Sequence, residues 1–165
     1  MYYPGSVMRF YEQNGNKLIW VMPDTVKSRA SEAMMLLDCV VQYGLNPLDY
    51  HPKQLQYEKL NRLTQQFNKA GDIEKARFDI MLTDAMIAFM NNLHFGKLNQ
   101  DYPATKIDAG SINGFSAGTI LKDALQAENF SAVIKNVQPK FKEYTDMQEH
   151  LRLLAGQYTG DCYQV

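Results

Sequence analysis

The clearest candidate for chemistry in this sequence is Ser116, which lies in the pentapeptide Gly-Phe-Ser-Ala-Gly at residues 114–118. The pattern matches Gly-x-Ser-x-Gly, in which a strand enters a sharp turn and exposes the serine as a nucleophile at the start of a helix. The residues before it, 108–113, are typical of a loop, and no parallel sheet is predicted around them. In the simpler interpretation Ser116 caps a helix. A serine hydrolase with His150 as its base is kept as an alternative.

Two aspartates, Asp79 and Asp84, lie within the otherwise apolar stretch 76–98. Carboxylates in such surroundings need hydrogen-bond partners or a route to water, and two of them together could perform acid–base catalysis. Because they are five residues apart, they do not share one face of a helix, which disfavours a catalytic pair. Asp79 is the stronger candidate for a buried structural hydrogen bond to the backbone of a loop.

The two cysteines and three histidines form no recognisable catalytic or metal-binding motif. Cys39 lies in an apolar segment, which predicts a small buried side chain, and Cys162 lies close to the C-terminus. The sequence leaves open whether they pair, and nothing favours a disulfide. His51, His94 and His150 lack the spacing of zinc ligands. We therefore expect no catalytic residue, no cofactor and no metal in this chain.

The elements that position these residues are predicted to be helices. Apolar residues spaced three and four apart indicate a long helix that Asp72 caps, that ends at Gly96, and that is buried along much of its circumference. Residues 9–14 are expected to form a short lead-in that is either helical or irregular. Further helices are expected from one of Asp24, Thr25 or Ser28 to about Tyr43, from Pro52 to about 70, from Ser116 or Thr119 to about 125, at 129–137, and at 142–158. Residues 97–115 are predicted to form one long loop. The expected fold is all-α, a compact bundle of five to seven helices in a single domain over residues 1–165.

The composition is that of an ordinary globular domain. With 165 residues, of which 45% are apolar, the chain can bury its own core. A net charge of −1, from 17 basic and 18 acidic residues, gives no basic excess for nucleic-acid binding. No apolar run is long enough to span a membrane. Residues 1–5 have neither the basic start nor the apolar centre of a signal peptide.

Several tyrosines flank predicted loops, at Tyr43, Tyr50, Tyr57 and Tyr102. Their rings and hydroxyls could dock a partner domain or a glycan. Packing at the rim of the core, with a solvated hydroxyl, is the simpler role for any one of them.

Three segments occur in a distinctive order: Tyr-Gly-Leu-Asn-Pro-Leu-Asp-Tyr at 43–50, Phe-Asp-Ile-Met-Leu-Thr-Asp-Ala at 78–85, and Gly-Lys-Leu at 96–98. A closing pattern follows at Pro139, Tyr144, Leu151 and Tyr158. This order resembles the scaffold domain of periplasmic L,D-transpeptidases, the cysteine enzymes that cross-link peptidoglycan stem peptides. The resemblance extends from Phe10 to Tyr158.

The resemblance implies a non-catalytic helical scaffold, cut from a larger parent chain, that supports or positions the catalytic domain and its substrate in cell-wall cross-linking. The family's catalytic domain uses a cysteine in a Ser-His-Gly-Cys context, which neither cysteine here matches, so no catalytic residue is carried over. The expected partners are the L,D-transpeptidase catalytic domain of the same parent chain and peptidoglycan. The expected location is the periplasm or cell envelope, with any signal peptide upstream of this chain. A free-standing helical adaptor is a further alternative.

Overall fold

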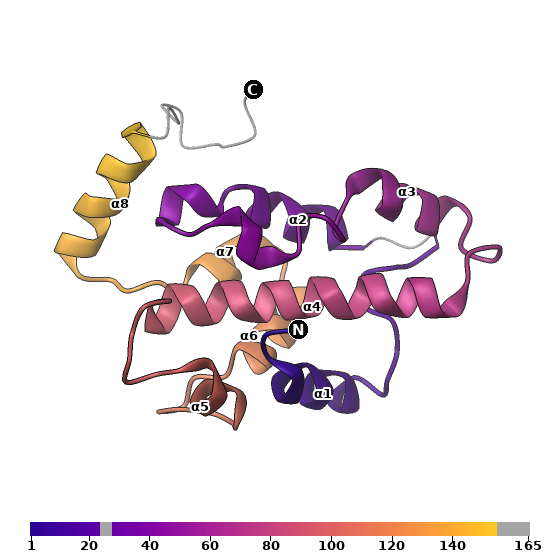
Figure 1. Ribbon diagram of the computed structural model, residues 1–165, viewed down its shortest axis with the longest axis horizontal. Coiled ribbons are helices and arrows are strands. Elements are labelled where there is room, and N and C mark those ends of the chain that lie inside the picture. Colours follow the sequence, from indigo (N-terminus) through magenta and orange to yellow (C-terminus); the bar gives the residue numbers. More distant parts are fainter. Residues whose placement is uncertain (24–27, 155–165) are drawn as a thin grey trace.

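The central element of the fold is the helix α4 (Asp72–Phe95), which runs through the middle of the molecule with the other helices around it (Figure 1). The computed structural model describes residues 1–23 and 28–154. Every residue of α4 from Leu82 to Asn91 is buried. The helix ends at Gly96, whose φ of +82° closes the last turn. The predicted buried helix and its stop are therefore confirmed, although Asp72 is its first residue and Gly71 its N-cap.

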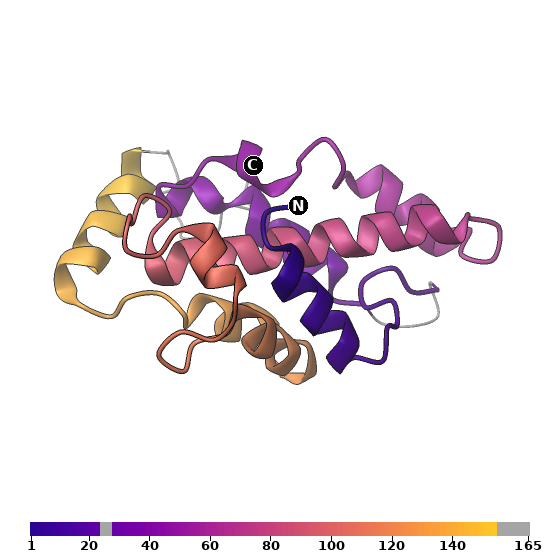
Figure 2. The ribbon, with the colours of Figure 1, turned by 60° about the horizontal axis from the view of Figure 1, so that its bottom comes forward.

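Helices pack against α4 from more than one side (Figures 1 and 2). One group consists of α1 (Pro4–Gln13) and α6 (Ala117–Gln126), which contact α4 and each other. The other consists of α2 (Ala30–Asp38) and the 3₁₀ helix η2 (Pro47–Tyr50). A short helix, α7 (Phe130–Lys135), contacts both α6 and α2 and so connects the two groups. The buried apolar side chains form one cluster between these elements.

The predicted helix from the N-cap candidates to Tyr43 is divided in the structure. It consists of α2, the junction residue Cys39, and a second 3₁₀ helix, η1 (Val40–Tyr43). Gly44 then ends it in the left-handed conformation, with φ of +71°, as expected for a glycine stop. Ser28 accepts a hydrogen bond from the amide of Ala30 at 3.1 Å. The other candidates, Asp24 and Thr25, lie outside the described residues.

Two predictions about the following segments were wrong. Pro52 does not start a helix: residues 52–54 form a turn, and α3 begins at Tyr57 and ends at Gln65. Residues 97–115 are not one uninterrupted loop, because they contain the short helix α5 (Ala104–Asp108), anchored by the buried Ile107. A five-residue helix presents too little sequence to show a helical period.

The last described helix, α8 (Lys142–Leu154), projects from the main body and contacts η1 (Figure 1). Its predicted end at Tyr158 lies outside the described residues. Over the described chain the all-α prediction is confirmed, with eight α-helices where five to seven were expected. None of the described helices combines the length and apolar character that a membrane span requires.

Candidate functional site

Asp79 is fully buried on α4, and its carboxylate binds the backbone of the segment that follows α1. Its Oδ1 accepts hydrogen bonds from the amides of Trp20 and Val21 at 2.7 and 2.8 Å. Its Oδ2 accepts one from the amide of Ile19 at 3.0 Å. Residues 17–23 form no helix, so the carboxylate supplies acceptors that regular structure would otherwise provide. The predicted structural hydrogen bond from Asp79 to a loop backbone is confirmed.

Tyr11 and Thr83 complete the surroundings of Asp79. The Tyr11 hydroxyl donates to Oδ2 of Asp79 at 2.5 Å and lies 2.9 Å from Oγ1 of Thr83. That threonine oxygen also accepts the indole N–H of Trp20 at 2.8 Å. Burial raises the pKa of Asp79, and the hydrogen bonds from Tyr11 and the three amides oppose this shift. Protein donors therefore surround the carboxylate, which serves the fold rather than a substrate.

Asp84 lies about one and a half turns further along α4 and holds the N-terminal residues. Its carboxylate accepts hydrogen bonds from the amides of Tyr2 and Tyr3, at 2.9 Å each, and lies 2.7 Å from Nε2 of His51. Burial would raise the pKa of Asp84, but the hydrogen bonds from His51 and the two amides outweigh burial and hold that pKa below its usual value. Asp79 and Asp84 thus bind different segments and form no catalytic pair.

A cleft of about 220 Å³ lies beside this N-terminal segment. The C-terminal half of α4 contributes Asn91 and Asn92 to its lining, and the loop between α4 and α5 contributes Lys97 and Tyr102. Tyr2 lines the cleft from the N-terminal segment. Its ring stacks on the imidazole of His51, with centroids 5.2 Å apart. The bonds that Asp84 makes therefore also fix one wall of the cleft.

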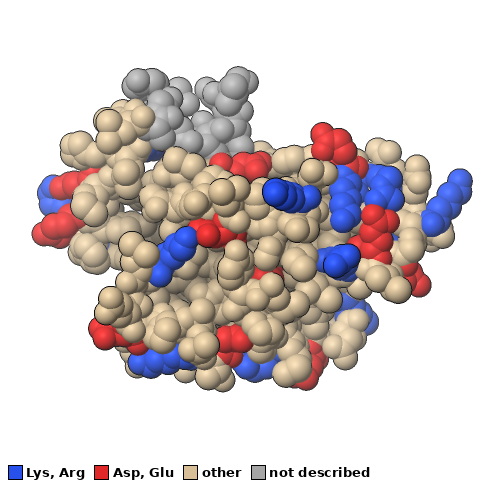
Figure 3. All heavy atoms as spheres, in the orientation of Figure 1, with Lys and Arg blue, Asp and Glu red and all other residues tan. Residues whose placement is uncertain are grey.

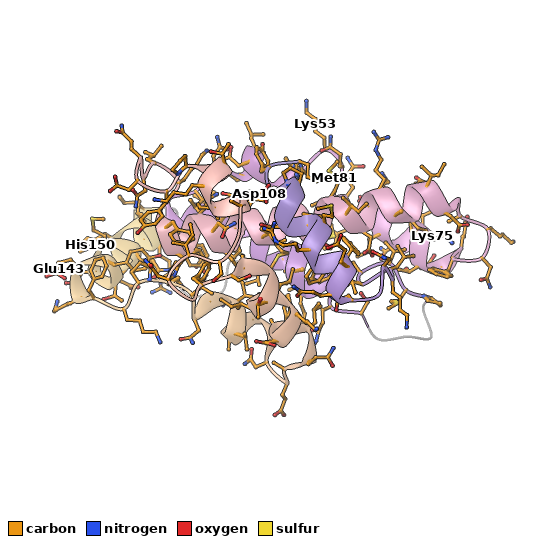
Figure 4. All side chains as sticks on the ribbon, turned by 90° about the horizontal axis from the view of Figure 1, so that it is seen from below. Lys53, Lys75, Met81, Asp108, Glu143 and His150 are labelled. Carbon is orange, nitrogen blue, oxygen red and sulfur yellow. The ribbon has the colours of Figure 1, made fainter. Side chains whose placement is uncertain are left out.

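Ser116 is the N-cap of α6, as the simpler interpretation predicted. Its Oγ accepts hydrogen bonds from the amide of Thr119 at 3.4 Å and from the Thr119 hydroxyl at 3.1 Å. No strand precedes it in the described chain, and an adjoining cavity of about 50 Å³ has no histidine, aspartate or glutamate in its lining. His150 lies on α8 (Figure 4), where its Nδ1 pairs with the carbonyl of Asp146 at 2.7 Å. Among the described residues, the lining of this cavity thus offers no general base for the serine.

Cys39 is buried and disulfide-bonded, so it offers no thiolate nucleophile. The predicted burial of Cys39 is confirmed. The sequence left its pairing open and gave no reason to expect a disulfide, yet the structure has Cys39 in one. Cys162 lies outside the described residues.

His94 stacks on Phe115 with ring centroids 3.8 Å apart, a packing role at the end of α4. Within residues 1–23 and 28–154, no three histidine, cysteine, aspartate or glutamate side chains are grouped to hold a metal.

Asp108, the last residue of α5, is a structural residue that the sequence did not reveal. Its carboxylate accepts hydrogen bonds from the amides of Gly5 and Ser6, at 2.9 and 2.7 Å, in the first turn of α1 (Figure 4). Its carbonyl oxygen accepts from Arg9 at 2.6 Å. The free amides of a helix N-terminus favour such a carboxylate. The sequence held one indication of such a partner: Tyr3, immediately before the helix, has no side chain that could cap it, so the free amides of α1 needed an acceptor from elsewhere.

The outer surface combines mixed charge with an exposed apolar stripe. Acidic and basic side chains are interspersed over the face in Figure 3, with no broad area of one sign. On α8, no residue is buried, and the apolar side chains of Met147 and Leu154 are 66% and 84% exposed. Phe141, just before this helix, is 58% exposed. Exposed apolar residues gathered on one helix are typical of a surface that contacts another protein part.

The comparisons with known proteins give one match. A family model described as Scaffold domain matches residues 5–151. The matched range contains Asp79, Asp84 and Ser116, and all of the cleft lining named above except Tyr2. No curated protein and no solved structure matches the chain.

Proposed function

Because this chain belongs to the Scaffold-domain family, we propose that it is the non-catalytic helical scaffold of a peptidoglycan L,D-transpeptidase. The observation that carries the proposal is the family match over residues 5–151, which includes the three ordered segments that resemble that domain. The scaffold supports or positions a catalytic domain of the same parent chain, and its substrate, during cross-linking of the cell wall. That role locates it in the periplasm or cell envelope.

The arrangement of the three segments supports a structural role. Segment 43–50 ends η1 and forms η2, and segment 78–85 lies on α4, which η2 contacts. Tyr43 and Tyr50 both pack against the buried ring of Phe89, with centroids 5.6 and 6.0 Å away. The residues that carry the resemblance therefore build the frame of the domain, which is what a scaffold requires.

The surface of α8 supports contact with a neighbouring domain. Met147 and Leu154 lie on one side of this helix, with Leu151 between them at helical spacing. Leu151 is 39% exposed, and its Cδ1 lies beside Gly44, so only part of this side rests on η1. In our proposal the remaining part packs against the catalytic domain of the parent.

The first experiment measures the size of the natural protein by immunoblotting cell fractions with an antibody raised against this domain. A band several times heavier than the 18.9 kDa of this chain, in the envelope fraction, would support the proposal. A band at 18.9 kDa in cells would contradict it and favour a free-standing helical adaptor.

The second experiment tests the role within that parent. Replacing the domain by a flexible linker should lower the fraction of L,D-cross-linked stem peptides, measured by chromatography of digested cell wall. A pair of substitutions, Met147→Asp and Leu154→Asp, should have the same direction of effect. The matched control is Thr145→Ala with Glu149→Ala, two exposed residues on the opposite side of the same helix, and it should leave cross-linking unchanged. Normal cross-linking without the domain would refute the scaffold role.

A further inference from the structure

The cleft beside the N-terminal tyrosines has no uncompensated charge. Lys97 and Asp49 are the charged side chains in its lining, and they form an ion pair with each other. A phosphate or carboxylate ligand would have to break the Lys97–Asp49 ion pair or bind without a positively charged side chain to neutralise it. The lining therefore favours an uncharged ligand.

Two neighbouring carboxamides, Asn91 and Asn92, supply hydrogen-bonding groups from α4. Burial raises the pKa of the Tyr3 phenol, and the neighbouring side chain of Asn91, which is itself 2% exposed, opposes that shift. Nδ2 of Asn92 donates to the hydroxyl of Tyr50 at 2.8 Å, which fixes the orientation of this amide. The Asn92 carbonyl oxygen is then available to accept an N–H or O–H from a ligand. A half-buried amide held in this way favours a ligand that carries its own polar N–H or O–H groups.

Tyr2 supplies an aromatic wall that is already fixed in place. Its backbone amide is bound by Asp84, and its ring stacks on His51. Even so, the residue remains 47% exposed. Another tyrosine ring of this lining, Tyr102, stacks on Phe95 with centroids 4.9 Å apart and has the ammonium of Lys106 at 4.8 Å from its ring centre. Tyr2 is therefore the ring available for a ligand, and its pre-organisation lowers the entropy cost of binding.

Size and chemistry together select a class of ligand. At about 220 Å³ the cleft is smaller than the roughly 300–1,000 Å³ of pockets for drug-sized ligands, so it admits about one ring. A sugar ring offers an apolar C–H face to an aromatic side chain and hydroxyls at its edge, and an acetamido substituent adds an amide N–H.

We propose that this cleft binds one uncharged N-acetylated sugar ring, with Tyr2 against the ring face and Asn92 accepting the acetamido N–H. The selection of an N-acetylated sugar among uncharged amides rests on the proposed function, because such sugars form the glycan strands of peptidoglycan. The cleft then holds the glycan strand while the catalytic domain works on the peptides attached to it.

The test is a titration of the ¹⁵N-labelled 165-residue chain with tri-N-acetylchitotriose, followed by NMR. Saturable shifts are expected at residues 2, 3, 92 and 96–102. Cellotriose, which has the same linkage without acetamido groups, should bind roughly tenfold more weakly because the Asn92 acceptor is left unused. N-acetyl-trialanine amide, a peptide with amide N–H groups but no sugar ring, should also bind more weakly.

Two substitutions locate the contacts. Tyr2→Ala and Asn92→Ala should each weaken binding of the chitotriose roughly tenfold. The matched controls Tyr57→Ala and Asn61→Ala replace residues of α3 outside the cleft and should leave binding unchanged. Asn92→Ala could unfold the chain, because it removes the bond to Tyr50. In that case the positions of the wild-type chemical-shift changes and the binding of Tyr2→Ala decide whether the sugar occupies this cleft.

Four results would overturn the inference: no saturable shift, shifts confined to another surface, equal binding of cellotriose, or tighter binding of the peptide amide. Each of these leaves the scaffold role intact, since domain deletion tests that role separately. Conversely, glycan binding in the cleft together with normal cross-linking after deletion would remove the scaffold role and keep the binding site.

Discussion

Asp79 binds the backbone amide of Trp20, and Thr83, on the same helix, binds the indole N–H of the same tryptophan. The carboxylate of Asp79 accepts the backbone N–H of Trp20 at 2.7 Å, while Thr83, one turn along α4, accepts the indole N–H at 2.8 Å. The tryptophan is completely buried, and its ring packs edge-on against Phe130 at 6.2 Å. One face of α4 thus fixes a non-helical segment that would otherwise bring unpaired amides into the core.

Substituting Asp79 should separate the loss of acceptors from the loss of charge. Asp79→Ala leaves the amides of residues 19–21 without their acceptor, and we expect it to lower the free energy of unfolding by about 4 kcal/mol. Asp79→Asn keeps a carbonyl oxygen for those amides and can donate to the Tyr11 hydroxyl, so its loss should be about 1–2 kcal/mol. Urea unfolding followed by the fluorescence of Trp20 measures both.

The control for this pair is Asp123→Ala, which removes an exposed carboxylate from α6 and should change stability by less than about 0.5 kcal/mol. Equal losses for Asp79→Ala and Asp79→Asn would contradict the prediction. They would mean that the negative charge, and not the supply of acceptors, stabilises the segment.

Asp84 should make the domain sensitive to acid. Burial raises its pKa, but hydrogen bonds from His51 and two amides outweigh burial, so the folded-state pKa lies below the unfolded-state value of about 3.9. A lowered carboxyl pKa gives stability that is present above the unfolded-state pKa and is lost as pH falls through the folded-state value. Asp84→Asn should therefore cost about 2 kcal/mol at pH 7, and the cost should shrink towards about pH 2.

Urea unfolding at both pH values checks this prediction, with Asp123→Asn as the control of equal charge. Asp79 provides an internal contrast, because burial raises its pKa. Its contribution to stability is largest below the unfolded-state pKa and declines as pH rises through the folded-state value. If the loss for Asp84→Asn were the same at both pH values, ionisation of Asp84 would have no part in holding the N-terminal residues.

Features that depend on neighbours in sequence could be predicted. The apolar spacing within 76–95 is sufficient to identify a buried helix, because burial and helical period act on the same residues. Gly96 and Ser116 are local signals of the end and the start of a helix. The role of Asp79 could also be expected, since a carboxylate among apolar residues must find donors.

Contacts between distant segments could not be predicted in the same way. Asp84 binds residues that are 81 and 82 positions away, and Asp108 caps a helix more than 100 positions before it. Nothing in the local pattern of α4 or α5 specifies those partners. Pro52 misled for a related reason: it suits the first turn of a helix, yet here it lies in a single turn closed by the bond from Leu55 to His51.

Two glycines should differ in their tolerance of a side chain. Gly44 has φ and ψ of +71° and +20°, the left-handed region that other residues occasionally adopt, so Gly44→Ala should cost about 1 kcal/mol. Gly96 has φ and ψ of +82° and +127°, which L-residues avoid more strongly, so Gly96→Ala should cost about 2–3 kcal/mol. Neither position is crowded, because the nearest atoms to an added Cβ are 3.5 and 3.9 Å away.

Thermal unfolding of both variants measures this difference, and Gly44→Asn is the control. Asparagine enters the left-handed region more readily than alanine, so it should cost less than alanine at Gly44. Equal losses at the two glycines would show that side-chain contacts, and not backbone conformation, determine the cost.

Ser116 should behave as a helix cap and show no reactivity as a nucleophile. Ser116→Ala removes the acceptor for the Thr119 amide and should cost about 1 kcal/mol in the free energy of unfolding. The comparison is Asn129→Ala at the N-cap of α7, whose Oδ1 accepts the Ala132 amide at 2.9 Å and which should cost at least as much. A fluorophosphonate probe should label neither the wild-type chain nor Ser116→Ala, because the described residues that line the adjoining cavity offer no base for this serine. Labelling of the wild type that disappears in Ser116→Ala would instead establish the hydrolase alternative.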